Sequence, residues 1–255
     1  MSTDNKPLVV ITIPCYNEGD RLSVKTIETF LDESDNVHFV FVDDGSSDAT
    51  HPLLAEIREY APGRVHILSR EVNEGKSAAV RRGVEYSLQH TSADYVGFWD
   101  ADLSAPLTEV WRFRDFMSRH PDVKLVMGAR LKRLGADVRR KAWRHYLGRG
   151  FATLASVVVG LAVYDTQCGA KLFTRELAEK VFEEPFRTQW CFDLEIMCRS
   201  REILGEENVH RQVYEMPLTQ WIHQEGSKVK FRHAPMIAVE LLKVWRIARR
   251  VKQEG

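Results

Sequence analysis

The fold class of this chain is decided by the stretch Phe39-Val40-Phe41-Val42-Asp43-Asp44-Gly45-Ser46-Ser47-Asp48. Its apolar half is short, β-branched and aromatic, which predicts a strand buried on both faces of a sheet. The run then changes abruptly to acids and turn-forming residues. Open α/β sheets bind ligands outside the carboxyl ends of their strands, so these acids indicate a binding site.

A second stretch repeats this arrangement. Tyr95-Val96-Gly97-Phe98-Trp99 runs into Asp100-Ala101-Asp102, and Pro106 follows shortly after. In one interpretation an acid caps the helix that Pro106 begins. In the other, both carboxylates converge on a hard cation such as Mg²⁺ or Mn²⁺, which usually also binds phosphate oxygens of its ligand. The second interpretation predicts a nucleotide diphosphate as the ligand.

The order of the predicted elements supports an α/β architecture. Strands are expected at residues 8–13, 37–42, 65–68, 95–99 and 123–127. Helices are expected between them, at about 20–32, 48–60, 76–90 and 107–119. Such alternation predicts a mostly parallel sheet with right-handed crossovers. Beyond Gly128 the alternation breaks, and helices are expected to dominate.

Composition narrows the class of protein. The 36 basic and 36 acidic residues cancel, so no global charge indicates a nucleic-acid partner. The four cysteines form no CxxC pair and follow no recognisable secretory signal, which predicts reduced thiols in a cytosolic protein without zinc. No apolar run reaches the roughly twenty residues needed to cross a bilayer. The run 151–163 is predicted to be either a buried core helix or a helix facing lipid.

Four polar motifs are expected on one edge of the predicted sheet. Each follows a predicted strand, and each alone is typical of a simple turn. Together, at the carboxyl ends of successive strands, they predict a single site. The motifs are Pro14-Cys15-Tyr16-Asn17-Glu18, Asp43-Asp44-Gly45-Ser46, Asn73-Glu74-Gly75-Lys76 and Asp100-Ala101-Asp102.

In combination these motifs resemble the inverting family 2 glycosyltransferases of GT-A fold, particularly the polyprenyl- and dolichyl-phosphate β-glucosyltransferase branch. The segment 165–173, Trp190 with the segment 192–195, and the segment 225–228 resemble signatures of that branch. The resemblance runs from Val9 to about Val229. It implies a GT-A (Rossmann-like) α/β catalytic domain over residues 1–232, with a mostly parallel sheet, flanking helices and a helical C-terminal part. Residues 233–255 are then expected to form a basic amphipathic helix.

The resemblance also implies roles for the donor-site residues. Tyr16 is expected to stack on the base, Glu18 to hold the ribose, and Asp43 to accept a hydrogen bond from the base, which suits uracil and guanine alike. Asp102 matches the main metal ligand and Asp100 lies nearer the ribose or the metal. Ser104 replaces a glutamine that is frequent in the mannosyl branch, which favours glucose. The donor-binding set is Pro14, Tyr16, Glu18, Asp43, Lys76, Asp100, Ala101, Asp102 and Gln167.

Cations are needed for a phosphate acceptor, and arginine suits bidentate phosphate recognition. By resemblance Arg130 and Arg149 bind the lipid phosphate, with Arg144 an alternative and Lys228 a further candidate. A solvated helix face is the competing interpretation for the basic run 139–149. By resemblance Asp193 is a catalytic-site residue, which acts either as a general base or as a group that orients the sugar or the acceptor. The alternative interpretation is that Asp193 is one of the acids that are favoured at the amino end of a helix.

The C-terminal stretch has two interpretations of equal weight. Apolar residues recur at helical spacing at Ile237, Leu241, Val244 and Ala248, and basic residues crowd the end beside Trp245. Such a helix lies in the plane of a membrane interface or caps the core.

These observations lead to one expected activity: metal-dependent, inverting transfer of glucose from UDP-glucose to a polyprenyl (dolichyl or undecaprenyl) phosphate. The protein is expected in the cytoplasm, peripheral at the cytosolic face of the membrane. One alternative keeps the mechanism with GDP-mannose as donor. A second is a soluble transferase acting on a sugar hydroxyl, with Asp193 as general base. A nucleotide-sugar-binding protein without turnover is the alternative of another class.

Overall fold

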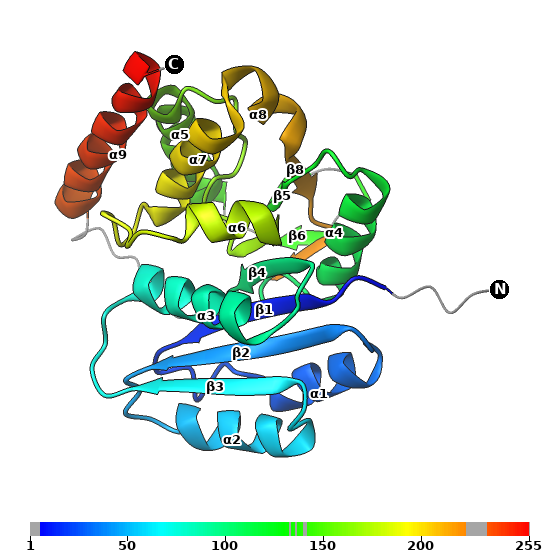
Figure 1. Cartoon of the computed structure of the whole chain (residues 1–255). Helices are drawn as coiled ribbons and strands as arrows, with labels where there is room; N and C mark the ends of the chain where they lie inside the picture. The colour runs from blue at the N-terminus through cyan, green and yellow to red at the C-terminus, as the bar shows by residue number, and fades with distance from the viewer. Residues whose placement is uncertain (1–5, 133, 136, 140–141, 223–233, 255) are drawn as a thin grey trace.

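A central sheet and a small second sheet contain the strands of the structure, a computed structural model that describes residues 6–132, 134–135, 137–139, 142–222 and 234–254. The seven strands of the central sheet are, in spatial order, β3 (Val65–Arg70), β2 (Val37–Asp44), β1 (Val9–Cys15), β4 (Tyr95–Trp99), β7 (Ala170–Thr174), β5 (Leu125–Ala129) and β8 (Val213–Pro217). The second sheet pairs β6 (Asp137–Arg139) with β9 (Gln220–Ile222). Helices cover both faces of the central sheet (Figure 1).

Neighbouring strands of the central sheet run parallel except at β7, which is antiparallel to both β4 and β5. This arrangement confirms the predicted mostly parallel α/β sheet. In the register of β1 and β2, Cys15 lies opposite Asp43, so the ends of these two strands are level. The loops that follow them therefore begin side by side at one edge.

The two faces of the sheet have separate hydrophobic cores. Successive strand residues alternate between them: Ile11 and Phe39 belong to one core, and Val10 and Val40 to the other. The first core includes α1 (Val24–Asp32), α2 (Thr50–Tyr60) and α4 (Thr108–Arg119). The second includes α3 (Lys76–His90), α5 (Ala142–Val159), α6 (Arg175–Val181), α7 (Phe192–Leu204), α8 (Glu206–Gln212) and α9 (Ala234–Glu254).

The predicted elements agree closely with the structure in the first half of the chain and less well in the second. The helix at 76–90 and the end of the strand at Trp99 have the predicted bounds. β2 continues through Asp44, so the acids expected in a turn are the last residues of the strand. Beyond Gly128 the structure also contains β6, β7, β8 and β9, none of which was predicted. β7 was missed because a lysine, Lys171, interrupts its apolar pattern.

The helix α9 packs against α5 and α7 at the upper left of Figure 1. Its inner face is buried at Glu240, Val244 and Ala248, whereas Val239 and Leu242 on its outer face are more than half exposed. α5 is divided in the same way, with Ala155 and Val159 buried, and Leu154 and Val157 exposed. Among the described residues, no helix is long and apolar enough to cross a membrane.

The four cysteines are buried and form no disulfide. Burial raises the pKa of the Cys168, Cys191 and Cys198 thiols to about 12. These three thiols therefore stay protonated near neutral pH, and they pack as small apolar groups.

We predict that Val244→Asp destabilises the protein and that Leu242→Asp, two positions earlier on α9, does not. Val244 is fully buried and Leu242 is 57% exposed, so only the first change places an unpaired carboxylate in the core. Thermal unfolding should show Tm lowered by roughly 5–10 °C or more for Val244→Asp. Equal Tm values for the two variants would contradict the packing of α9 on the body.

Candidate active site

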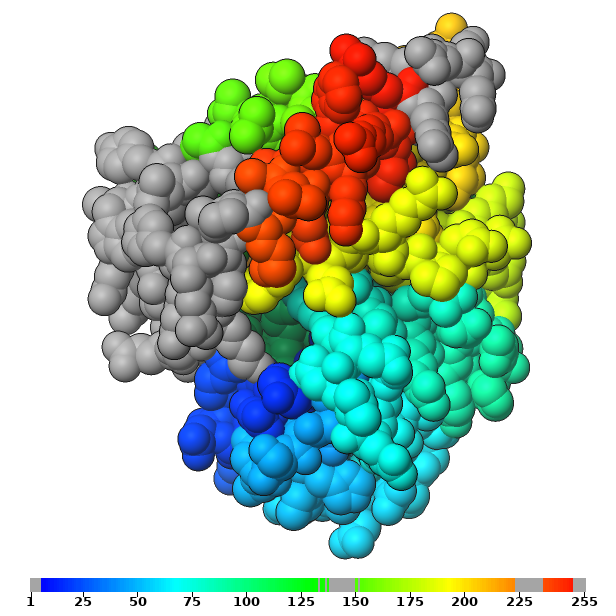
Figure 2. All heavy atoms as spheres, turned by 90° about the vertical axis from the view of Figure 1, so that its left-hand side faces the viewer, coloured from blue at the N-terminus to red at the C-terminus, as the bar shows by residue number. Residues whose placement is uncertain are grey.

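The loops that follow β1, β2, β3 and β4 meet at the carboxyl edge of the central sheet, as predicted. Figure 2 looks onto this edge and shows a hollow bordered by the blue segment after β1, the cyan start of α3 and the yellow segment before α7. The polar side chains of the four predicted motifs are therefore brought to one place.

Backbone hydrogen bonds tie the first two of these loops together. Three successive N–H groups after β1 donate to side chains that follow β2: Asn17 to Ser46 Oγ (3.0 Å), Glu18 to Thr50 Oγ1 (2.8 Å) and Gly19 to Asp48 Oδ2 (2.9 Å). The loops consequently form one rigid unit, in which the positions predicted to hold a nucleoside are fixed relative to each other.

The residues predicted to hold the nucleoside lie within this unit. Tyr16 is 39% exposed. Glu18 is buried and its Oε2 lies 2.5 Å from Nη2 of Arg21. Asp43 is also buried; its Oδ1 accepts the Ser46 N–H at 3.0 Å. Pro14 belongs to the end of β1, next to these groups.

A residue without a predicted role, Asp44, fixes the start of α3. Its carboxylate accepts hydrogen bonds from the N–H groups of Glu74 and Gly75, the latter at 2.8 Å. Burial raises the pKa of Asp44, and the Gly75 amide and the charge of Arg70 oppose that effect. In the sequence, this role of binding backbone amides is indicated by the second acid of an Asp-Asp pair at a strand end.

Lys76, the first residue of α3, points to the acids that follow β4. Its Nζ lies 2.5 Å from Oδ1 of Asp100. Burial alone would lower the pKa of Lys76, but the charges of Asp100, Asp193 and Asp102 raise it overall. The ammonium group therefore stays charged among three carboxylates, at the amino end of a helix that favours anions.

Neither acid of the Asp100-Ala101-Asp102 turn caps the following helix, because α4 begins at Thr108 with Leu107 as its N-cap and no side-chain cap hydrogen bond, so the helix-capping interpretation is wrong. Oδ1 of Asp102 instead accepts the N–H of Ser104 at 3.0 Å, within the turn itself. Ala101 is buried beneath the turn. Asp100 and Asp102 nonetheless lie on the same side as Lys76, whose pKa both of them raise.

Gly169 provides the space that the Asp100 carboxylate occupies. A Cβ atom at residue 169 would lie 1.9 Å from Oδ2 of Asp100 and 2.1 Å from its Cγ. The backbones are also joined, because the N–H of Asp100 donates to the carbonyl of Gly169 at 2.9 Å. The segment before β7 therefore forms the wall against which Asp100 rests.

Asp193, in the first turn of α7, forms a buried ion pair. Its Oδ1 lies 2.5 Å from Nζ of Lys171, which is fully buried and also donates to the carbonyls of Cys168 (2.7 Å) and Thr166 (3.2 Å). Lys171, which interrupts the apolar pattern of β7, therefore holds Asp193 in place. The predicted catalytic-site role of Asp193 stays a prediction.

Arg130, which follows β5, is held by Asp165. Its Nε and Nη2 lie 2.6 and 2.7 Å from the two carboxylate oxygens, and its backbone N–H donates to Oδ2 at 3.0 Å. Glu215 on β8 holds the same turn by accepting the N–H groups of Tyr164 and Asp165 at 2.7 and 2.8 Å. Burial would lower the pKa of Arg130, but Asp165 chiefly, and Asp100 to a smaller extent, raise it. Asp100 thus influences the pKa of both Arg130 and Lys76, and the four residues Lys76, Asp100, Asp102 and Arg130 are named the charged cluster.

Several predicted acceptor residues cannot be placed in this cluster. Arg144 and Arg149 belong to α5, but their side chains lie outside the described part of the structure, as does all of Lys228. Gln167 is half-buried and precedes the Gly169 wall; its buried Nε2 has no hydrogen-bond partner among the described residues.

The acids of the cluster suit a divalent cation that is completed by its ligand. Among the described residues, no three His, Cys, Asp or Glu side chains are arranged to hold a metal. Two carboxylates, those of Asp100 and Asp102, are nevertheless the oxygen donors that Mg²⁺ or Mn²⁺ takes when phosphate oxygens and water supply the rest. The residues therefore fit a cation bound together with a diphosphate.

A hollow of about 630 Å³ lies at the opposite, amino edge of the sheet. It is lined by residues 91–94, Lys124 and residues 174–176, which include two acids and two bases. Ligands of parallel sheets bind at the carboxyl ends of the strands, so the hollow at the amino edge is not the candidate site.

Comparison with known proteins identifies related chains. Residues 10–182 match glycosyl transferase family 2. Dolichyl-phosphate beta-glucosyltransferase of Dictyostelium discoideum is 29% identical over 94% of this chain and 74% of its own length. That of Saccharomyces cerevisiae is 30% identical over 89% and 70%. Polyprenol monophosphomannose synthase of Mycolicibacterium smegmatis is 29% identical over 75% and 71%.

A solved structure has the same fold. Glucosyl-3-phosphoglycerate synthase of Mycobacterium tuberculosis, crystallised with Mn²⁺, UDP and glucosyl-3-phosphoglycerate, superposes with a TM-score of 0.66 at 19% identity. The match covers 93% of this chain and 78% of the other.

We predict that Gly169→Ala weakens binding of UDP in the presence of Mn²⁺ by roughly tenfold or more, because the added methyl group displaces the Asp100 carboxylate from its place beside Lys76. Gly63→Ala is the matched control, since no atom lies within 4 Å of a Cβ at residue 63. Isothermal titration calorimetry measures both. Unchanged affinity in a folded Gly169→Ala protein would show that the position of Asp100 does not matter for UDP.

Proposed function

The chain belongs to glycosyl transferase family 2, and from that premise we propose that it transfers glucose, with inversion, from UDP-glucose to a polyprenyl phosphate. The observation that carries the proposal is the cluster of Asp100, Asp102, Lys76 and Arg130 at the carboxyl edge of the sheet. Glucose is favoured because the Dictyostelium and yeast relatives, which match over most of this chain, are glucosyltransferases by name.

The donor occupies the hollow at the carboxyl edge. Tyr16 stacks on the base, Glu18 binds the ribose and Asp43 accepts the base N–H; all three belong to the rigid unit formed by the loops after β1 and β2. Lys76 and the amino end of α3 bind the diphosphate. The sugar then lies toward Asp193 and Gln167.

Asp100 and Asp102 hold Mg²⁺ or Mn²⁺ in this proposal. When bound, the cation neutralises the charge that develops on the leaving diphosphate. The M. tuberculosis enzyme of the same fold was crystallised with Mn²⁺ and UDP, which supports a divalent cation here as well. Lys76 adds a fixed positive charge on the same leaving group.

A phosphate acceptor removes the need for a general base. Its second pKa is about 6, so the phosphate is mostly a dianion at neutral pH. One of its oxygens attacks the anomeric carbon in line with the departing UDP, and the configuration inverts. Arg130, oriented by Asp165, binds the acceptor phosphate through the part of its guanidinium that Asp165 does not use. Asp193, held by Lys171, orients the sugar.

The outer faces of α5 and α9 form the surface that meets the membrane. They carry exposed apolar side chains at Leu154, Val157, Val239 and Leu242, beside exposed Arg246. In Figure 2 the red end of α9 lies beside the green end of α5, above the hollow. Exposed apolar groups next to cations suit an interface with anionic lipid. A peripheral position at the cytosolic face of the membrane is part of this proposal.

Mannose is the second candidate sugar, favoured by the similarity to the mycobacterial monophosphomannose synthase. The test is a panel of UDP-glucose, UDP-galactose, GDP-mannose and UDP-N-acetylglucosamine with a short-chain polyprenyl phosphate and Mn²⁺. Mass spectrometry of the lipid product identifies both substrates. Glucosyl polyprenyl phosphate from UDP-glucose supports the proposal, and mannosyl polyprenyl phosphate from GDP-mannose would replace glucose by mannose. A parallel reaction with a free sugar in place of the polyprenyl phosphate tests the acceptor, and product only with the sugar would refute a phosphate acceptor.

We predict that Asp102→Asn lowers kcat by roughly 10²–10³-fold while the protein stays folded, because the amide has the shape but not the charge of a metal-binding carboxylate. Chelation of divalent ions by EDTA should reduce the rate of the wild-type protein to a similar level. Turnover that survives both treatments would remove the metal from the mechanism.

We predict that Arg130→Lys raises KM for the polyprenyl phosphate by roughly one to two decades and changes KM for UDP-glucose little, since a charged hydrogen bond contributes about 1.5–3 kcal/mol. Lysine keeps a charge beside Asp165 but loses the planar fork. Steady-state kinetics with each substrate varied gives both constants. Equal effects on both would place Arg130 at the diphosphate of the donor instead.

We predict that the protein binds vesicles containing phosphatidylserine and that binding weakens as salt is raised, because exposed cations on α9 contribute to it. Leu242→Asp should reduce binding in a co-sedimentation assay, since it adds a negative charge to the proposed lipid-facing surface. Val72→Asp, at an exposed residue of the loop before α3, is the control. Equal loss of binding in both variants would exclude a specific role for α9.

A further inference from the structure

The segment Arg187–Cys191, which directly precedes α7, has no regular secondary structure, yet its backbone is held at every residue. Glu195 accepts the N–H groups of Arg187 (2.9 Å) and Thr188 (3.1 Å). Glu240 accepts those of Gln189 (2.9 Å), Trp190 (2.8 Å) and Cys191 (2.8 Å). Two carboxylates thus bind five successive amides. Glu195 belongs to α7 itself, whereas Glu240 reaches the segment from α9.

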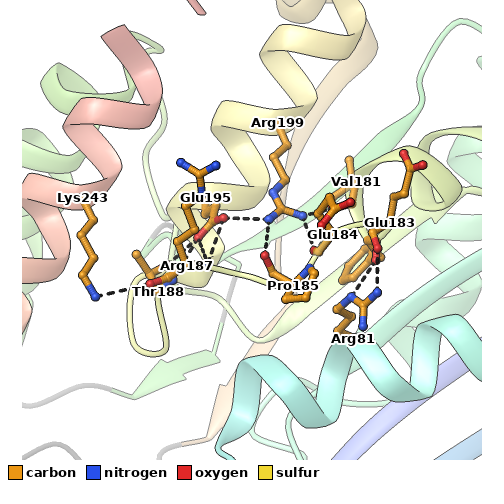
Figure 3. Close-up of polar contacts among 11 residues, drawn as sticks. Arg81, Val181, Glu183, Glu184, Pro185, Arg187, Thr188, Glu195, Arg199 and Lys243 are labelled. Carbon is orange, nitrogen blue, oxygen red and sulfur yellow. Dashed lines mark hydrogen bonds and ion pairs between the residues drawn. The ribbon is translucent and has the colours of Figure 1, made fainter. Parts of the chain in front are cut away.

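The environment of the two acids makes these contacts strong. Glu195 and Glu240 are 1% and 5% exposed. Glu195 also pairs with Arg199 at 2.8 Å, and Figure 3 shows Arg199 continuing to the carbonyls of Val181, Glu184 and Pro185. Among the described residues, by contrast, no cation pairs with Glu240. Three convergent amide dipoles therefore stabilise its charge, and loss of that charge leaves three amide donors with a poorer partner.

The held segment reaches the candidate active site. A Cβ atom at Gly75, the residue before Lys76, would lie 3.9 Å from Cδ of Gln189, so this side chain lies at the start of α3. Asp193 follows Cys191 by two residues, and its charge contributes to the raised pKa of Lys76. The placement of both groups depends on the backbone between them.

We propose that Glu240 is a positioning residue of the active site: from the C-terminal helix α9 it holds the amides of Gln189, Trp190 and Cys191 and thereby sets Gln189 and Asp193 against the donor. This inference rests on the proposed function. A second contact of α9 with the same segment is weaker, since Nζ of the exposed Lys243 lies 3.5 Å from the Arg187 carbonyl (Figure 3).

The variants that test this proposal are Glu240→Gln and Glu240→Asp. Glutamine keeps the length but turns an NH₂ donor toward amides that are themselves donors. Aspartate keeps the charge on a shorter side chain. Glu202→Gln, at an exposed residue of α7, is the matched control, and Val244→Ala weakens the packing of α9 without removing an acceptor. Lys243→Met removes the weak second contact.

The expected result is a split between kcat and donor binding. In Glu240→Gln, kcat for glucose transfer falls roughly 10- to 100-fold because a small displacement of catalytic-site groups has this effect on rate. The Kd for UDP with Mn²⁺ changes less than about threefold, because the nucleoside lies against β1 and β2. Glu240→Asp recovers part of kcat. Lys243→Met and Glu202→Gln retain it, and Val244→Ala lowers Tm but keeps kcat per folded molecule.

Three outcomes would overturn the proposal. Folded Glu240→Gln with kcat within twofold of wild type would show that the contact is not used in catalysis. Unfolded Glu240→Gln together with a folded, fully active Glu240→Asp would make the residue structural only. Equal losses of kcat in Glu240→Gln and Val244→Ala would assign the effect to general loosening of α9. A wild-type protein that forms no lipid-linked sugar would contradict the proposed function, and the inference with it.

Discussion

Buried and half-buried carboxylates hold the irregular backbone at the carboxyl edge of this protein, and the candidate active site depends on that constraint. Asp44 binds the amides before α3, and Glu215 binds the turn that carries Asp165. Glu195 and Glu240 bind the segment before α7. An unpaired buried N–H group costs about as much as a lost hydrogen bond. Each acid therefore replaces the partner that a helix or strand would have provided.

A second set of carboxylates, which pair with cations, explains the charge balance of the site. Among the described residues, three cations near the candidate donor site are each paired with a carboxylate: Lys76 with Asp100, Lys171 with Asp193 and Arg130 with Asp165. The described part of the site therefore has little net positive charge with which to bind a diphosphate and a lipid phosphate together. A divalent cation that enters with the donor supplies the missing charge, which is why metal dependence is part of the proposed function.

The sequence predicted the elements whose signals are local. α3 has its predicted bounds because Gly75 precedes a run with helical spacing, and β4 ends where its apolar run meets Asp100. The four polar motifs of the candidate site were predicted for the same reason, because strand ends and turns are determined by residues that are neighbours in the sequence. The mostly parallel sheet followed from their order.

The features that were not predicted depend on long-range contacts. β7 contains Lys171, whose charge is tolerated because Asp193, 22 positions away, neutralises it. Glu240 binds amides about fifty positions earlier in the chain. No local pattern distinguishes such an acid from one on a solvated helix face. The C-terminal helix accordingly had two interpretations from sequence, and its inner face packs on the body while its outer face stays exposed.

Hydrogen–deuterium exchange with and without UDP and Mn²⁺ tests most directly whether the edge organised by these acids is the donor site. Binding should slow exchange in residues 14–19, 43–48 and 73–77 and in the turn at 100–104. Exchange at residues 91–94, beside the hollow at the amino edge, should not change. Protection confined to the amino edge, or no protection at saturating UDP and Mn²⁺, would contradict the account.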